Sequence, residues 1–410
     1  MNKENKLVPE FRFPIFKNEG EWEEKVVSQL AEYENGKAHE QDINVDGKYV
    51  VVNSKFISTD GEVRKYTNSA NCIAQKDDIL MVLSDVPNGR AIAKCFVVDR
   101  DNFYTVNQRI CKLTPTNADS KILYYLLNRN AYFLNFDDGV KQTNLRNEDV
   151  LNCPLVLPKN PKEQEKIASC LSSLDETIKA HSQKLDVLKD HKKGLMQNLF
   201  PQEGEKMPKY RFKEFENAGD WVEKKLKDLG EFLGGGTPSR SNSEYWSGNI
   251  PWISSSDINE NDIHNISITQ YINESAIIES ATKIIPKGSI LFVSRVGVGK
   301  LAINNEELCT SQDFTSFIPK EVLNLFIAYF FSANKNSLQT LSQGTSIKGF
   351  SKSDLEDSKI IFPKNPQEQQ KIASCLSSLD SIIKAQAAKI EQLKLHKKGL
   401  MQGMFPKIND

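Results

Sequence analysis

The sequence predicts an α+β fold: two similar mixed α/β domains separated by two long helices that form an antiparallel coiled coil, with a pseudo-twofold internal repeat. One reason is that residues 158–201 recur as residues 363–406, with 31 of the 44 aligned positions identical. A second is that both copies carry apolar residues at heptad spacing, the period of a coiled coil. A third is that the segment in front of each domain also recurs. A repeat this close indicates a duplicated structural unit.

The segment in front of each domain runs over residues 7–27 and again over residues 207–227. The residues that match are Arg12, Phe13, Phe16, Gly20 and Trp22 in the first copy, and Arg211, Phe212, Phe215, Gly219 and Trp221 in the second. We predict that each copy forms a small packed leading segment. The repeated unit is therefore a leading segment, a domain and a long helix.

Residues 1–158 are predicted to form the first domain. Strand-like apolar runs, separated by Gly, Asn and Asp turns, occur at residues 49–52, 79–83, 91–98 and 155–157. A helix is predicted at residues 120–135, where isoleucine and leucine recur at helical spacing. This mixture of strands and helix favours an α+β domain.

Residues 204–362 are predicted to form the second domain on the same plan. The segments that correspond are 76–93 with 287–303, Asn107-Gln108 with Ser311-Gln312, the helix at 120–135 with 322–341, and 139–158 with 344–363. The frame is shared while the loops differ. Two related domains with different loops suit the recognition of two different things.

The long helices are predicted within residues 159–203 and 363–410. Asn160 suits the N-cap, Pro161 suits the first helical position, and Glu163 completes a capping box. The apolar seam of the coiled coil is predicted at Ile167, Leu171, Leu174, Ile178, Leu185, Leu188 and Leu195, and at Ile372, Leu376, Leu379, Ile383, Ile390, Leu393 and Leu400.

Polar residues interrupt this seam at equivalent places, His181 and Lys192 in one helix and Gln386 and Lys397 in the other. Such positions cost stability but fix the register of a coiled coil. A helix of about 37 residues is roughly 55 Å long at 1.5 Å per residue, longer than a small core requires. The alternative, that each helix serves a separate core, leaves the length and the shared seam unexplained.

The composition is that of an ordinary soluble protein, with 39% hydrophobic and 26% charged residues. We find no long apolar run and no signal peptide, so we expect a cytoplasmic protein with no membrane segment. The seven cysteines include no C-x-x-C spacing, which argues against a disulfide framework or a zinc site. The formal net charge of −1 means that any binding to DNA needs locally concentrated positive charge, or positive charge from partner subunits.

No catalytic or metal-binding motif is found. The segment SRVGVGKL (294–301) lacks the first glycine and the final Ser or Thr of a phosphate-binding loop, so we predict a hairpin turn there. The glycine-rich segment 233–241 precedes no clear helix, and we predict a flexible, exposed loop. The five histidines never pair at metal spacing. A binding or scaffolding protein is therefore favoured over an enzyme.

Basic, amide and hydroxyl side chains gather in loops of both domains. These residue types bind guanine, adenine and phosphate groups respectively, so the clusters are candidates for contact with DNA, although most single members of such a set serve only as solvated surface. In the first domain they are Lys55, Arg64, Lys65, Asn88, Arg90, Lys141, Gln142, Asn144 and Arg146. In the second domain they are Thr237, Ser239, Arg240, Ser254, Ser255, Ser256, Arg295, Lys300, Gln312, Thr345, Ser346 and Lys348.

The whole chain resembles the specificity subunit of type I restriction-modification systems. The segments that carry the resemblance are GGGTPSRSNSEYWSGNIPWISSSDI (234–258), GVGKLAI (297–303), SQDF (311–314), GTSIKGFSKSDL (344–355) and PKNPQEQQKIASCL (363–376). The opening of the first domain lacks the GGGTPS and PWISSSDI segments. The resemblance implies two target-recognition domains separated by near-identical long helices.

The resemblance also implies a function and partners. Each recognition domain would read one part of a bipartite double-stranded DNA target, and the coiled coil would set the spacer. The helices would dock two methyltransferase subunits, which bind S-adenosylmethionine, and restriction and translocase subunits would join them. This chain would hold no cofactor and no catalytic residue.

Two other functions remain open from the sequence. A protein-only scaffold would show no salt-sensitive affinity for DNA, because it would neutralise no phosphates. A stand-alone methyltransferase or nuclease would consume S-adenosylmethionine or cut DNA as the purified chain, and no pocket motif supports that activity.

Overall fold

The structure, a computed structural model, describes residues 7–202, 204–335, 338 and 349–406. The chain forms two compact units: unit 1 contains residues 1–181 and 389–410, and unit 2 contains residues 182–388. Each unit holds one of the two predicted domains together with parts of both long helices. The predicted segment boundaries after residues 158, 203 and 362 stay predictions, because the units divide the chain inside the long helices instead.

Unit 1 is built on two four-stranded sheets. One has the strand order β2-β10-β6-β8 and the other the order β4-β3-β9-β5, while β1 pairs with β12 and β7 with β11. The strands are β1 (Glu23–Val26), β2 (Ala31–Asn35), β3 (Tyr49–Val52), β4 (Tyr66–Thr67), β5 (Ile73–Ala74), β6 (Ile79–Val82), β7 (Ser84–Asp85), β8 (Cys95–Val97), β9 (Tyr104–Val106), β10 (Ile110–Pro115), β11 (Thr143–Asn144) and β12 (Pro154–Leu157).

Strand β6 separates two hydrophobic cores. Ile79 and Met81 belong to one core, and Leu80 and Val82 belong to the other. Successive side chains of a strand point to opposite faces, so a strand buried on both faces reads as an unbroken apolar run. The predicted strand at 91–98 is shorter than expected. It is regular only over β8, because Ala93 has a φ of 54°, in the left-handed region.

The prediction of one helix at 120–135 is wrong, because this segment of unit 1 forms two helices. The structure has α1 (Ser54–Ser58), α2 (Ser120–Leu127), α3 (Ala131–Leu134) and α4 (Asn147–Leu151), with the 3₁₀ turns η1 (Pro14–Phe16) and η2 (Val27–Gln29). Arg129 has a φ of 60°, which stops α2. Asn130 then starts α3, because its side chain accepts a hydrogen bond from the backbone N–H of Tyr132.

Unit 2 repeats the plan of unit 1. Its sheets have the orders β14-β21-β18-β19 and β16-β15-β20-β17, and β13 pairs with β22 as β1 pairs with β12. The strands are β13 (Val222–Lys225), β14 (Gly230–Gly234), β15 (Ile250–Ile253), β16 (Gln270–Ile272), β17 (Ile284–Ile285), β18 (Ile290–Val293), β19 (Leu301–Ile303), β20 (Leu308–Thr310), β21 (Phe314–Pro319) and β22 (Lys359–Phe362). The shared frame that the sequence predicts is therefore confirmed.

Apart from the two long ones, the helices in the described part of unit 2 are short. They are α6 (Glu274–Ile278), α7 (Asn324–Ala333) and α9 (Lys352–Asp357), with the 3₁₀ turns η3 (Lys213–Phe215), η4 (Leu226–Asp228), η5 (Ser243–Trp246) and η6 (Ser255–Asp257). The described part of the helix predicted at 322–341 is mostly α7. This helix is apolar on most sides and is buried, which suits a helix in the middle of a core.

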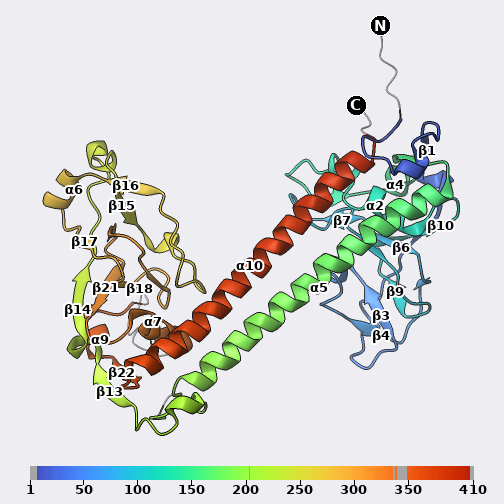
Figure 1. The fold of residues 1–410 in the computed structure, drawn as a ribbon. Coiled ribbons are helices and arrows are strands. Elements are labelled where there is room, and N and C mark those ends of the chain that lie inside the picture. The colour runs from blue at the N-terminus through green and yellow to red at the C-terminus, as the bar shows by residue number, and fades with distance from the viewer. Residues whose placement is uncertain (1–6, 203, 336–337, 339–348, 407–410) are drawn as a thin grey trace. The chain divides into compact units, whose positions relative to one another are not determined.

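The long helices are α5 (Pro161–Leu199) and α10 (Pro366–Met404), each of 39 residues, drawn in green and red in Figure 1. In unit 1, Asp175 in the first half of α5 pairs with Lys397 in the second half of α10. In unit 2, Asp380 in the first half of α10 pairs with Lys192 in the second half of α5. Within each unit the two helices therefore run antiparallel, as predicted.

Burial along the seam follows the predicted heptads. Every predicted seam residue is at least partly buried. Those exposed by less than a tenth are Ile167, Leu171, Ile372, Leu376, Leu379 and Ile390. Of these six, Ile167 and Leu171 belong to a core of unit 1, and Ile372 and Leu376 belong to a core of unit 2.

Each leading segment is clamped to the start of its long helix by a buried ion pair. In unit 1, Arg12 donates to both oxygens of Glu163 at 2.7 and 2.8 Å, and Trp22 donates to the same carboxylate at 3.3 Å. In unit 2, Arg211, Trp221 and Glu368 repeat the arrangement at 2.7, 2.7 and 3.2 Å. These two clusters are called the clamps below.

The clamps correct the predicted capping box. Asn160 does cap α5, since its side chain accepts from the N–H of Lys162 at 3.0 Å. The carboxylate of Glu163 faces Arg12 and Trp22 instead of the helix N-terminus. A paired guanidinium offers two charge-assisted hydrogen bonds, which are stronger than a bond to one backbone N–H.

Candidate nucleic-acid interface

In unit 2, four segments meet at one end of the two sheets and are tied together by backbone hydrogen bonds. Gly236, which follows β14, donates to Thr310 at 2.8 Å, and Ser311 donates to Ile253 at 2.9 Å. Ser294, which follows β18, donates to Asp313 at 2.8 Å. We call residues 235–241, 254–257, 294–300 and 311–313 loop cluster 2. Strands hold both ends of 294–300 and of 311–313, and 235–241 and 254–257 each directly follow a strand, so these side chains are carried close to the sheets.

Most of the predicted side chains of the second domain lie in loop cluster 2. Thr237 donates to Gln312, and Lys300 reaches the carbonyl of Ser255 at 3.4 Å. Arg295 is exposed on the hairpin between β18 and β19, which confirms the hairpin turn predicted for 294–301. Ser239 and Ser256 are exposed, Ser254 is half-buried and Ser255 is buried. Thr345, Ser346 and Lys348 lie outside the described residues.

Arg240 is held in a defined orientation by tryptophans. Its guanidinium carbon lies 3.9 Å from the ring centroid of Trp246 and 5.1 Å from that of Trp252. One terminal nitrogen donates to Gln270 at 2.8 Å. A stacked guanidinium keeps the donors at its edge available, which suits recognition of a phosphate or a base.

The glycine-rich segment at 233–241 is only partly the exposed loop that we predicted, because Ser239, Arg240 and Ser241 are exposed but Gly235 and Gly236 pack against neighbouring backbone. A Cβ on Gly235 would lie 2.0 Å from the carbonyl oxygen of Ser311, and one on Gly236 would lie 2.4 Å from the backbone of Ala281. Gly236 is buried and donates into the sheet. The glycines are there because two backbones approach each other too closely for a side chain.

Unit 1 has an equivalent arrangement, which we call loop cluster 1. Asn107 donates to Val52 at 3.0 Å and Leu83 donates to Arg109 at 3.0 Å, as Ser311 and Ser294 do in unit 2. A Cβ on Gly36 would lie 2.1 Å from the carbonyl oxygen of Asn107. The cluster consists of residues 36–40, 84–90, 107–109 and 137–145.

Five of the predicted residues of the first domain are brought together in loop cluster 1. Gln142 donates to Ser84 at 2.7 Å, Asn88 donates to the carbonyl of Gly139 at 3.1 Å, and β7 pairs with β11. These contacts join the hairpin after β6 to the segment before α4. The five predicted residues are Asn88, Arg90, Lys141, Gln142 and Asn144, and all are exposed.

The other four predicted residues of unit 1 lie at the edges of this arrangement. Arg146 begins α4 and bonds to Asp149 at 3.3 Å, which raises the pKa of its guanidinium. Lys55, Arg64 and Lys65 are exposed on α1 and the turn that follows it.

The sequence reasoning missed Gln108, which belongs to loop cluster 1 and is exposed. Its amide donates to Glu40 at 3.2 Å, on the same turn where Gln312 accepts from Thr237 in unit 2. The exposed Arg109 is its neighbour. The signal was present, because Asn107-Gln108 aligns with Ser311-Gln312.

Among the described residues, no group of His, Cys, Asp and Glu could hold a metal ion, and no helix is long and apolar enough to cross a membrane. The polar loops instead combine hydrogen-bond donors and acceptors with side chains of fixed positive charge. Such surfaces recognise other polar molecules through hydrogen bonds and charge.

A family model described as "Type I restriction modification DNA specificity domain" matches residues 19–190 and 218–395. The type I restriction enzyme MjaIX specificity subunit of Methanocaldococcus jannaschii is 40% identical over 168 residues, covering 40% of this chain and 39% of that protein. The EcoR124I/EcoR124II specificity subunit of Escherichia coli is 33% identical over 177 residues, covering 41% and 42%. The alignments thus span about two fifths of these two relatives. The MjaVIII specificity subunit of Methanocaldococcus jannaschii is 24% identical over 408 residues, covering 93% of this chain and 91% of that protein.

Solved structures show the same fold. The S subunit of a type I restriction-modification system from M. genitalium aligns with a TM-score of 0.64 at 17% identity, covering 98% of this chain and all of that one. A chain from a study of complex assembly and conformational transition of a type I R-M system aligns with a TM-score of 0.55 at 15% identity, covering 94% and 97%. The order of sheets and long helices described above is therefore that of these chains.

Proposed function

This chain belongs to the type I restriction-modification DNA specificity family, and from this premise we propose that its two domains are target-recognition domains, each reading one part of a bipartite DNA target. The observation that carries the proposal is the pair of loop clusters. They stand on the same strand frame but present different side chains, as two readers of different bases require.

The long helices would set the spacer between the two parts of the target and dock two methyltransferase subunits. The bases would be methylated by those partners with S-adenosylmethionine, and restriction and translocase subunits would complete the assembly. In this proposal no residue of the present chain is catalytic and no cofactor binds to it. The candidate contacts of each half-site are the predicted residues of the two loop clusters, with Gln108 and Arg109 added.

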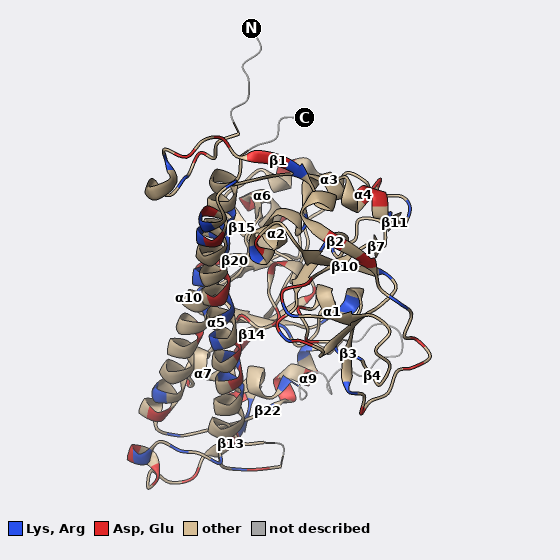
Figure 2. Cartoon of the chain, turned by 90° about the vertical axis from the view of Figure 1, so that its right-hand side faces the viewer, with Lys and Arg blue, Asp and Glu red and all other residues tan. Residues whose placement is uncertain are grey.

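The net charge of the chain suits a DNA-binding subunit that acts together with partner subunits. Its formal net charge is −1, and acidic and basic residues are interspersed along both long helices (Figure 2). Phosphate neutralisation gives most of the sequence-independent affinity of DNA-binding proteins. We therefore expect the isolated chain to bind DNA weakly, and the methyltransferase subunits to supply the remaining positive surface.

Methylome sequencing tests this function. Cells that express this chain together with a cognate methyltransferase subunit are expected to carry methylated adenine in one asymmetric bipartite motif, and cells that lack either protein are not. A methyltransferase subunit that works with another specificity subunit, but yields no motif with this chain, would favour the protein-only scaffold.

Replacing Arg295 with alanine is expected to impair the reading of the second half-site alone. Loss of a bidentate contact to a base lowers discrimination by about 1–3 kcal/mol. The measurement is the methylation rate on a set of targets in which each half-site base is varied in turn. Arg90→Ala in loop cluster 1 is the matched control and should impair the first half-site alone. An equal effect of Arg295→Ala on both half-sites would contradict the division of labour.

A further inference from the structure

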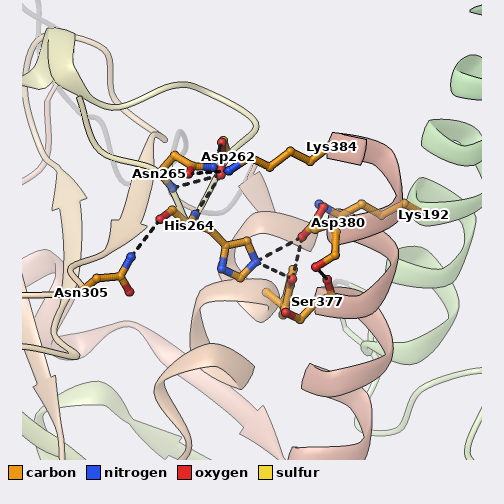
Figure 3. Close-up of polar contacts among 10 residues, drawn as sticks. Lys192, Asp262, His264, Asn265, Asn305, Ser377, Asp380 and Lys384 are labelled. Atoms are coloured by element: carbon orange, nitrogen blue, oxygen red, sulfur yellow. Dashed lines mark hydrogen bonds and ion pairs between the residues drawn. The ribbon is translucent and has the colours of Figure 1, made fainter. Parts of the chain in front are cut away.

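In each unit, one lysine of the coiled-coil seam lies where the two long helices meet the recognition domain. In unit 2, Lys192 of α5 lies 2.5 Å from one oxygen of Asp380 of α10, and Tyr329 of α7 donates to the other oxygen at 2.6 Å. Figure 3 shows Lys192 and Asp380 facing each other from the two long helices. One carboxylate therefore ties α5 and α10 to each other and to the recognition domain.

Unit 1 contains the same arrangement. Lys397 of α10 lies 2.6 and 2.7 Å from the two oxygens of Asp175 of α5, and Tyr125 of α2 donates to that carboxylate at 2.7 Å. In both units the lysine ammonium also faces the tyrosine ring, 5.0 Å from its centroid for Tyr125 and 5.6 Å for Tyr329. We call each set of lysine, aspartate and tyrosine a joint.

The joints are poorly explained as a source of stability. The side chains of Lys192 and Asp380 are each 17% exposed, and the ring of Tyr329 is fully buried. Burying two charges costs hydration free energy, and this cost offsets much of the attraction between them. Burial raises the pKa of Tyr125 and of Tyr329, so both hydroxyls remain donors to a carboxylate. The joint therefore adds little net stability but requires one definite geometry of its three side chains.

Apolar heptads cannot choose one register by themselves. A seam of leucine and isoleucine packs similarly when one helix slides by a heptad or rotates slightly. A joint does not tolerate that change, because a displaced helix leaves a half-buried aspartate without its lysine and its tyrosine. Polar residues inside a coiled-coil seam are known to specify register for this reason.

In unit 2, a loop of the domain makes a further contact with the same aspartate, Asp380. The ring of His264 lies 3.0 Å from the hydroxyl of Tyr329 and 3.5 Å from Asp380. One residue further along, Asn265 accepts from Lys384 of α10 at 2.9 Å. These residues belong to the loop that Asp262 orders, and Figure 3 shows the loop directed at α10. The domain thus holds the helix through a loop as well as through α7.

We propose that the two joints are positioning residues that fix the axial and rotational place of each recognition domain on the helix pair, and so make the target spacer a single length. This inference rests on the proposed function. The apolar seam would provide the affinity between the helices, and the joints would select one register.

The test compares the spacer preference of joint variants. Asp380→Asn and Asp175→Asn, singly and together, are expressed with the methyltransferase subunit on plasmids whose two half-sites are separated by the wild-type spacer or by one base pair less or more. The expected result is that preference for the wild-type spacer falls about tenfold, because a hydrogen bond to a charged group contributes on that scale. The bases read in each half-site should not change.

Three controls separate positioning from folding. The exchange Lys192→Asp with Asp380→Lys should restore part of the spacer preference, because it rebuilds the ion pair with reversed polarity while Tyr329 loses its carboxylate acceptor. Glu391→Gln removes the exposed ion pair of Glu391 with Lys394 on the same helix and should leave the spacer unchanged. Tyr329→Phe and Tyr125→Phe remove only a hydroxyl, so they still test the idea where the aspartate variants fail to fold.

The outcomes are distinct. Variants that fold and methylate with the same sharp spacer as the wild type would overturn the positioning role while leaving the proposed function intact. A wild-type chain that directs methylation at no spacer would overturn the proposed function itself.

Discussion

Replacing Glu368 with alanine is expected to lower the free energy of unfolding of unit 2 by about 3–5 kcal/mol, the usual cost of removing one partner from a buried ion pair. The Glu368 side chain is fully buried and accepts from Arg211 and Trp221. The side chain of Arg211 is 11% exposed. Its guanidinium stays protonated when Glu368 is removed, because arginine is charged with or without an acidic partner. An uncompensated charge then remains in the interior.

Urea unfolding followed by tryptophan fluorescence measures this effect, since Trp221 is part of the clamp. Glu163→Ala should destabilise unit 1 to a similar degree, because Arg12 and Trp22 contact Glu163 as their counterparts contact Glu368. Glu321→Ala breaks the exposed pair of Glu321 with Lys224 and should cost less than about 1 kcal/mol. A cost this small for Glu368→Ala would contradict the role of the clamp.

Removing two heptads from each long helix is expected to shorten the target spacer while both half-sites keep their bases. Deleting residues 176–189 and 381–394 leaves both joints in place, since Asp175 and Lys397 and also Lys192 and Asp380 lie outside the deletions. Fourteen residues correspond to about 21 Å of helix at 1.5 Å per residue. That length equals roughly six base pairs at 3.4 Å each.

The methylome of cells carrying the shortened chain and the methyltransferase subunit gives the spacer directly. Deleting residues 176–189 alone is the control. It leaves the two helices unequal in length, so the two joints cannot both form and methylation should be lost. Altered half-site bases in the doubly deleted chain would contradict the idea that the helix pair acts as a ruler.

The long helices and the shared frame could be predicted from the sequence because their signals are local and repeated. A heptad seam needs only the residues of one helix, and its polar interruptions at Lys192 and Lys397 proved to be interhelical ion pairs. Their partners could not be predicted. Asp175 and Asp380 lie on the opposite helix, and Tyr125 and Tyr329 come from the domains.

Long-range contacts also explain the errors. Glu163 has the spacing of a capping box, but its partner Arg12 lies 151 residues away in the chain. The apolar pattern at 120–135 continues across a break that depends on one left-handed residue, Arg129. Within the site, the residue types were found, but contacts such as that of Gln108 with Glu40 depend on how distant loops meet.

The close approach of the backbone at Gly36 and at Gly235 has an evolutionary consequence. In each unit the chain crosses a neighbouring loop so closely that no side chain fits, at equivalent positions of the duplicated frame. Under the proposed function, side chains on either side of the crossing can change with the target without disturbing the sheets. The glycine cannot be replaced without rebuilding the frame. At each of these two glycines a side chain would therefore displace the backbone of the neighbouring loop.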